Sequence, residues 1–205
     1  MASDAFEKFR RSMQIGYMEW HDGIGYDLEA LGALPPEERQ LAEDLVVARR
    51  AADWRDIEAL DQLGSERALY ELEKAARSPK PLEVQLHAAE RLARRRLLSE
   101  QQVEDIILAA LAHTTILNGM DKTPRLAAAY PTPAVKKKLL RCALHGHDDV
   151  RVHAAALVHF LHGGSSSHFD MEQRLFYLRF GSKSRSDRRV AYAELCTKIG
   201  VDPEE

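Results

Sequence analysis

Histidines and carboxylates gather in one part of this sequence. Six of the nine histidines lie between residues 145 and 168, and the first two belong to the run His145-Gly-His147-Asp-Asp149. Imidazole and carboxylate groups are ligands that zinc prefers. A later histidine of the group, His153, falls at the same position of a repeated helix as His87, which favours a structural role. We therefore expect no metal or other cofactor, and keep a site at His145, His147 and Asp149 as the alternative.

A second segment combines aromatic rings with acids. Residues 20–28 read Trp-His-Asp-Gly-Ile-Gly-Tyr-Asp-Leu, and the two glycines allow a tight backbone path. Aromatic side chains with polar tips are typical of the centre of a protein interface. The candidate partner-binding residues are Trp20, His21, Asp22, Tyr26, Asp27 and Trp54. The competing interpretation, favoured by the usual burial of aromatic rings, is that they fasten the N-terminal helices to the rest of the chain.

Two basic runs suggest an alternative role in nucleic-acid binding, because lysine and arginine neutralise phosphates. The candidate residues are Arg94, Arg95, Arg96, Lys136, Lys137, Lys138 and Arg141. Both tryptophans, however, lie in the acidic first third of the chain, far in sequence from these runs. Catalytic residues are not predicted, since the sequence has neither a Gly-x-Ser-x-Gly motif nor a phosphate-binding glycine-rich loop.

Charge is unevenly distributed along the 205 residues. The net charge is −3, but residues 1–65 carry −7, residues 66–141 carry +5 and the remainder carries −1. Such asymmetry affects the choice of partner and the association rate more than the fold. The alternative is that these charged residues simply occupy solvent-exposed helix faces.

We predict that these residues are positioned by helices arranged in pairs. Residues 65–96 predict a helix, a break at residues 78–81 and a second helix, with apolar residues at the spacing of one buried stripe. The second helix recurs 66 residues later, where Val150, His153 and Ala154 take the places of Val84, His87 and Ala88. This offset is two periods of a two-helix repeat.

The pattern of a polar residue, Val, another polar residue and an Ala-Ala pair resembles the inner helix of HEAT repeats, in the compact bacterial form also found in phycobilin lyases. This resemblance covers roughly residues 53–96 and 133–162. It implies an all-α fold, an irregular HEAT-like solenoid of about eight to ten helices in a right-handed superhelix. It further implies a single domain, 1–205, with an N-terminal cap over 1–50, repeats over 51–162 and a C-terminal cap over 163–205.

Other helices follow from periodicity and capping residues. The aromatic stripe from Phe6 to Trp20 predicts one helix over residues 5–20. Pro35 and Pro36 begin a helix to about residue 50 that should bury Leu41, Leu45, Val46 and either Val47 or Ala48. Further helices are expected over 53–63, from Ser99 to about residue 113, near 125–130, and from Asp187 to Gly200, with a linker at 163–167.

A cytoplasmic, soluble protein is expected, because there is neither a signal-peptide pattern nor a long apolar run. Cys142 and Cys196 both fall on apolar helix faces, which favours reduced core thiols over a disulfide.

Non-catalytic protein binding is the function that we predict, because helical arrays offer curved surfaces to large partners. The compact form resembles bacterial HEAT-type immunity proteins, which neutralise a cognate toxin. The resemblance thus implies a toxin partner, whose basic surface the acidic first third would complement. The alternatives are a HEAT-like DNA glycosylase or other nucleic-acid-binding protein, and a metal-binding or lyase-like enzyme. The histidine run also resembles part of the His-x-His-x-Asp-His motif of metallo-β-lactamase-like hydrolases, although Val150 stands where that motif has its last histidine.

Overall fold

The fold is all-α, as the sequence predicts. The computed structural model describes residues 2–77, 81–115 and 118–203, and in these residues it has thirteen α-helices and two 3-10 turns. The chain divides into two compact units, Met1–Leu98 and Ser99–Glu205, which are treated separately below. Within the described ranges, no helix combines the length and the apolar character that a membrane crossing requires.

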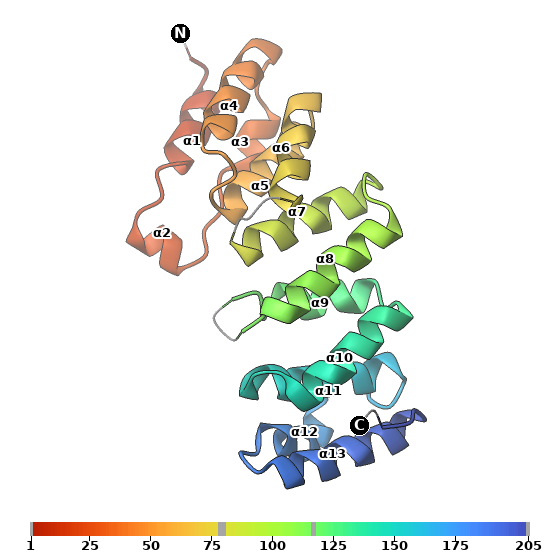
Figure 1. The fold of residues 1–205 in the computed structure, drawn as a ribbon. Coiled ribbons are helices and arrows are strands. Elements are labelled where there is room, and N and C mark those ends of the chain that lie inside the picture. The colour runs from red at the N-terminus through yellow and green to blue at the C-terminus, as the bar shows by residue number, and fades with distance from the viewer. Residues whose placement is uncertain (1, 78–80, 116–117, 204–205) are drawn as a thin grey trace. The chain divides into compact units, whose positions relative to one another are not determined.

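Seven helices form the N-terminal unit (Figure 1). They are α1 (Asp4–Ser12), α2 (Tyr17–His21), α3 (Leu28–Gly32), α4 (Pro36–Ala48), α5 (Trp54–Leu63), α6 (Glu66–Arg77) and α7 (Leu82–Arg94). Helix α5 packs against α3, α4, α6 and α7, so it is the central element of this unit.

The first helix is shorter than its aromatic stripe predicts. Helix α1 ends at Ser12, and Gly16 begins α2 in an extended conformation, φ −88° and ψ −175°. The Gly16 N–H donates to the Glu19 carboxylate at 3.0 Å, and a Cβ on Gly16 would lie only 2.7 Å from that carboxylate. The predicted continuous helix over 5–20 is therefore wrong, because a glycine start signal interrupts it.

The first predicted helix pair is present as α6 and α7, which pack against each other. Small side chains such as Ala68, Ala75, Ala88 and Ala89 are buried along the pair and allow close approach of the helices. The predicted break falls mostly on residues 78–80, which lie outside the described residues; Pro81 is the N-cap of α7.

Helix α4 buries Val46 as predicted, but the two leucines predicted beside it are not buried. It buries Ala42, Glu43 and Val46, whereas Leu41 and Leu45 are 54% and 38% exposed. The buried stripe runs through positions 42, 43 and 46, so positions 41 and 45 fall on the solvent side of the helix.

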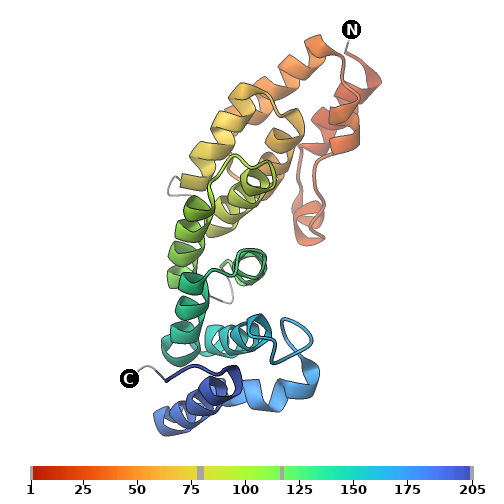
Figure 2. The same ribbon diagram turned by 90° about the vertical axis from the view of Figure 1, so that its right-hand side faces the viewer.

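The C-terminal unit contains the remaining elements (Figure 2). They are α8 (Glu100–His113), α9 (Lys122–Ala129), α10 (Pro133–His145), α11 (Asp148–Leu161), η1 (Met171–Gln173), α12 (Arg174–Leu178), η2 (Arg179–Gly181) and α13 (Arg185–Ile199). Ser99 caps α8 as predicted, and Gly200 ends α13 at φ 68°. Cys142 and Cys196 are buried and are not joined in a disulfide, and burial raises the pKa of the Cys142 thiol.

The second predicted pair is present as α10 and α11, but its repeat positions are not all equivalent. Val150 and Ala154 are buried like Val84 and Ala88 of α7. His153 is exposed beside the Phe169 ring, whereas the predicted equivalent His87 is 5% exposed. The shared structural role predicted for these two histidines is therefore wrong.

Arg151 of α11 forms hydrogen bonds that join η2 to this helix. The side chain is 7% exposed, and its guanidinium donates to the carbonyl oxygens of Phe180 and Gly146, both at 2.8 Å, and to Asp148 at 2.7 Å. These bonds hold both the turn before α11 and the end of η2.

His159 lies inside the aromatic cap of this unit. Its Nδ1 is 2.9 Å from the Tyr177 hydroxyl, and the imidazole is 3% exposed. Gly164 approaches so closely that a Cβ there would lie 2.2 Å from the imidazole ring. Burial lowers the pKa of His159, the positive charge of Lys198 lowers it further, and Asp170 opposes the shift.

This burial predicts a pH-dependent stability. The unfolded chain binds a proton at His159 near its ordinary pKa of about 6.5, whereas the folded protein resists that proton. Stability should therefore fall as the pH drops below about 6.5, until the lower folded pKa is passed. Urea unfolding followed by circular dichroism at pH 7.5, 6.5 and 5.5 measures this slope, which should flatten in His159→Gln. The exposed His145→Gln is the control, and an unchanged slope in His159→Gln would contradict the assignment.

Candidate partner-binding surface

Helix α2 and the turn after it expose large apolar side chains. Tyr17 is 72% exposed, Met18 and Trp20 are each 62% exposed, and Ile24 is 50% exposed. In both views the helix lies at the end of an excursion of the chain between α1 and α3 (Figures 1 and 2). We call these four residues the α2 surface. Apolar residues gathered in this way, rather than scattered singly, indicate an interaction site.

Aromatic contacts order the α2 surface internally. The Tyr17 ring centroid is 6.1 Å from Trp20 and 6.0 Å from the His21 ring. His21 Nδ1 is 2.9 Å from the Asp22 carboxylate. The rings are thus arranged before any partner arrives, which lowers the conformational entropy lost on binding.

A buried arginine of α5 holds this excursion in place. Arg55 is 2% exposed, and its Nε donates to the Ile24 carbonyl oxygen at 2.5 Å, while Nη2 lies 3.4 Å from the Glu19 carbonyl oxygen. Its charge is balanced by Asp53, whose two carboxylate oxygens are each 3.1 Å from Nη1. The backbone on both sides of the turn is therefore fixed to α5.

A second buried charge, Asp56, holds the end of the excursion just before α3. This carboxylate is fully buried and accepts from the Tyr26 hydroxyl at 2.8 Å and from Arg49 Nε at 2.6 Å. Burial raises the pKa of the Tyr26 phenol, and the Asp56 charge raises it further, so the hydroxyl remains a donor. Tyr26 also packs edge-on against Phe9 of α1, with centroids 6.3 Å apart.

Trp54 has an interior role as well. Its ring stacks on His87 of α7, 5.8 Å between centroids, and the Arg55 guanidinium lies 4.5 Å from its centroid. The ring is only half-buried: besides His87 it lies against Gly25, where a Cβ would be 3.6 Å from the ring.

The predicted partner-binding residues therefore separate into two groups. Trp20, His21 and Asp22 are exposed together at α2. Tyr26 is 6% exposed and cannot meet a partner, which corrects that part of the prediction. Asp27 caps α3 through the Ala30 N–H, and its own N–H donates to the Ser12 hydroxyl, both at 2.8 Å, so it too serves the fold.

Sequence reasoning overlooked Tyr17, Met18 and Ile24 as surface residues, and Arg55 altogether. Tyr17 and Met18 both fell within the helix predicted over residues 5–20, and Tyr17 belonged to its aromatic stripe. The signal that could have separated them is Gly16, which together with Gly23 and Gly25 brackets a short segment.

The two basic runs lie in different units. In the N-terminal unit, Arg94 pairs with Glu90, and Arg95 Nε is 2.5 Å from an oxygen of Asp61. The exposed Arg96 adopts φ 59°. In the C-terminal unit, Lys136, Lys137, Lys138 and Arg141 lie on α10, spread around the helix because three of them are consecutive. The carboxylate partners reduce the charge that the arginine run offers to phosphates.

The histidine run forms the junction of α10 and α11. His145 ends α10 and His147 is the N-cap of α11, both exposed, while the Asp149 side chain lies outside the described residues. Among the side chains that the structure describes, no group of three histidines, cysteines or acids is placed to hold a metal ion.

Comparisons of the chain with protein-family models, with curated proteins and with solved structures gave no match. Function is therefore inferred from the geometry of this chain alone.

Removing the Arg55 side chain should release the α2 surface from α5. In Arg55→Met, the Ile24 carbonyl and Asp53 lose their buried partner, and we expect about 3 kcal/mol of lost stability, as when one member of a buried charged pair is removed. Urea unfolding measures the loss. Chymotrypsin should also cleave faster after Tyr17 and Trp20.

The control is Arg67→Met, which removes an exposed ion pair with Asp44 on the same unit. It should change neither stability nor cleavage noticeably. Equal cleavage of Arg55→Met and the native chain would show that Arg55 does not hold this segment.

Proposed function

We propose that this protein is a non-catalytic protein-binding module, and that its N-terminal unit engages a protein partner through the α2 surface. The observation that carries the proposal is the exposure of Tyr17, Met18, Trp20 and Ile24 on a segment that the buried Arg55 holds rigidly. A rigid scaffold under exposed aromatic rings is the arrangement expected of binding hot spots.

The charge around the α2 surface indicates the chemistry of the partner. Asp22 is exposed and Glu19 is half-exposed on the same segment, and Arg55 is neutralised by Asp53 in the interior. Residues 1–98 carry 19 acids and 15 lysines and arginines. The occupant that fits is a protein with an apolar recess bordered by basic side chains.

A HEAT-like array is the scaffold that we infer for this module. The α6–α7 and α10–α11 pairs, each with buried small residues, support this inference. An immunity protein that neutralises a basic toxin would fit both the scaffold and the acidity, and this role is part of the proposal. Its specific test is whether the bound partner has a toxic activity that the native protein inhibits.

Truncating the aromatic rings should abolish capture of the partner. We expect Trp20→Ala and Tyr17→Ala each to weaken binding at least about tenfold, the cost of losing an interface hot spot. The measurement is a quantitative pull-down from the native lysate, followed by titration of the captured protein. Because both side chains are exposed, the variants should unfold at the same urea concentration as the native protein.

The matched control is Tyr70→Ala on α6, which removes an aromatic ring that is 63% exposed on the same unit. It should leave capture intact. If all three variants retain the partner equally, the α2 surface is not the binding site.

Reversing one charge at the edge of the surface should slow association. Asp22→Lys removes attraction to a basic partner, so we expect a lower association rate at low salt and a smaller dependence of that rate on ionic strength. Stopped-flow or surface-based kinetics with the captured partner measures both. Glu37→Lys makes the same charge change on α4 and should have the smaller effect; an equal effect would indicate only a general dependence on net charge.

A further inference from the structure

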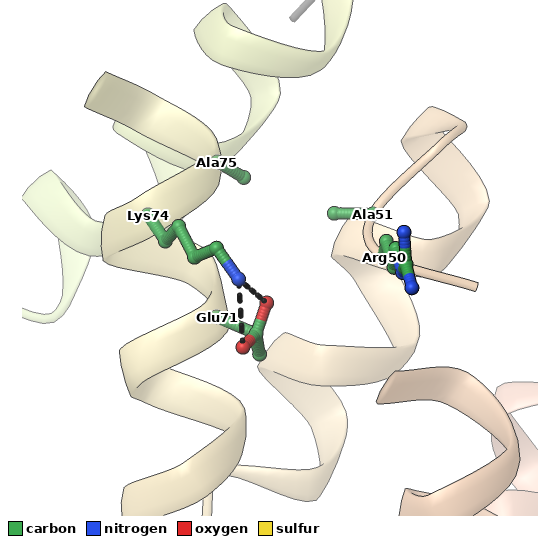
Figure 3. Close-up of a pocket in the computed structure, with 5 residues that line it drawn as sticks. All are labelled: Arg50, Ala51, Glu71, Lys74 and Ala75. Carbon is green, nitrogen blue, oxygen red and sulfur yellow. Dashed lines mark hydrogen bonds and ion pairs between the residues drawn. The ribbon is translucent and has the colours of Figure 1, made fainter. Parts of the chain in front are cut away.

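The pocket between the turn after α4 and one face of α6 has its main groups engaged already (Figure 3). Lys74 Nζ lies 3.3 and 3.4 Å from the two oxygens of Glu71. The two alanines of the lining, Ala51 and Ala75, are only 2% and 1% exposed. This pocket therefore offers a ligand little to bind.

A second apolar surface lies in the C-terminal unit, on the helical stretch formed by η1, α12 and η2 (Figure 1). Met171, Leu175 and Leu178 are 66%, 82% and 46% exposed. Their spacing of four and then three residues places them on one side of a helix. We call these three residues the α12 surface. Like the α2 surface, it groups apolar side chains in the way that indicates an interaction site.

The opposite side of this stretch anchors it to α11. Tyr177 and Phe180 are fully buried. The Tyr177 hydroxyl is 2.9 Å from His159 Nδ1, and the Phe180 carbonyl accepts from Arg151 Nε at 2.8 Å. The α12 surface is thus held in position before a partner binds, which lowers the conformational entropy lost on binding.

Exposed cations border the α12 surface. Residues 171–190 contain six lysines and arginines and two acids, a net charge of +4. Arg174, Lys183, Arg185 and Arg189 are exposed, and the ion pairs of the described residues involve none of them. These four charges remain available to an acidic partner.

A recess adjoins the α12 surface. It has a volume of about 380 Å³ and is lined by Arg179, Ser182, Asp187 and Val190. Arg179 follows Leu178 in the chain and pairs with Glu194 of α13, and Val190 of the same helix is 61% exposed. The recess therefore adds an apolar side chain and a hollow beside the exposed leucine.

The α2 surface has the complementary character. Residues 16–28 contain three acids and neither lysine nor arginine, so their net charge is −3 with His21 neutral. Its exposed side chains include the rings of Tyr17 and Trp20, whereas the α12 surface consists of methionine and leucine, which pack well against aromatic rings. The occupant inferred above for the α2 surface, an apolar recess bordered by basic side chains, is what the C-terminal unit presents.

We propose that the α2 surface of one copy of this chain binds the α12 surface of a second copy. This inference rests on the binding role proposed for the α2 surface and names an occupant for it. Opposite charges would orient the two copies, and the apolar side chains would be buried between them. Each side offers few apolar residues, so the interface is at the small end of the range and the association is reversible. A partner that binds more tightly would displace the second copy.

The first test is sedimentation velocity of the full chain from about 5 to 500 μM, the range in which a weak association becomes visible. The sedimentation coefficient should rise with concentration, and less so in about 0.5 M salt, which screens exposed charges. Trp20→Ala and Leu175→Glu should each weaken self-association at least about tenfold, the cost of losing an interface hot spot. Gln101→Glu adds the same charge at an exposed site of α8 and should have no effect.

Mixing the two variants tests whether the two surfaces bind each other. Trp20→Ala retains the α12 surface, and Leu175→Glu retains the α2 surface. An equimolar mixture should therefore form a one-to-one complex that neither variant forms alone. If the native chain self-associates but the mixture stays as monomeric as its components, the α2 surface does not bind the α12 surface and the proposal fails.

Other outcomes would assign the α12 surface to another occupant. A native chain that is monomeric at every concentration overturns the proposal. So does a monomeric chain that cosediments with vesicles of phosphatidylserine and phosphatidylcholine and loses this binding in Leu175→Glu, because the α12 surface would then contact lipid. Capture of a different protein, abolished by Trp20→Ala in a chain that does not self-associate, would preserve the function proposed for the α2 surface and overturn only this inference.

Discussion

Two adjacent opposite charges, Arg55 and Asp56, are buried in α5, and the organisation of the N-terminal unit depends on them. Burying either charge without partners would cost several kcal/mol. The cost is offset because each is surrounded by hydrogen bonds: Arg55 donates to Ile24 and Asp53, and Asp56 accepts from Tyr26, Arg49 and two backbone N–H groups. These partners come from the excursion between α1 and α3, from the end of α4 and from the turn before α5. Satisfying the two charges therefore determines where three separate segments of the chain lie.

The same pair connects the fold to the proposed binding surface. Arg55 fixes the segment that carries the exposed rings of the α2 surface, and Asp56 fixes the turn between α4 and α5. A surface held in this way loses little conformational entropy when it binds, so more of the contact energy contributes to affinity. Asp56 also helps to hold Arg50 and Ala51 at positive φ values, because it accepts hydrogen bonds from the N–H groups of the two residues that follow them.

Local patterns in the sequence predicted most of the longer helices, although the described residues form thirteen helices where about eight to ten were expected. Long-range polar contacts account for several of the side chains that were misplaced. The helix pairs, the Ser99 cap and the ends at Gly64 and Gly200 follow from periodicity and capping residues, which act over a few positions. Arg55 and Arg151 were not predicted as buried, because each bonds to carbonyl groups about thirty residues away, and no local pattern encodes such a partner. Leu41 and Leu45 were assigned to the core, whereas α4 buries Ala42, Glu43 and Val46 instead, a neighbouring stripe that includes a charged residue. Of the candidate site, composition located the segment that includes Trp20, His21 and Asp22, but it could not tell the exposed Trp20 from the buried Tyr26, since both are aromatic residues beside acids.

The two helix pairs show why a repeat pattern predicts packing better than it predicts function. Val84 of α7 and Val150 of α11 occupy equivalent positions and are both buried. In each pair the first helix packs against the second. His87 and His153 differ in what lies over them: Trp54 of α5 stacks on His87, whereas His153 lies exposed beside Phe169. The repeat thus specifies the contacts within a pair, and the irregular segments around it decide which side chains reach the solvent. The α2 excursion is one such segment, and the proposed binding surface consequently rests on an interruption of the helical pattern rather than on the pattern itself.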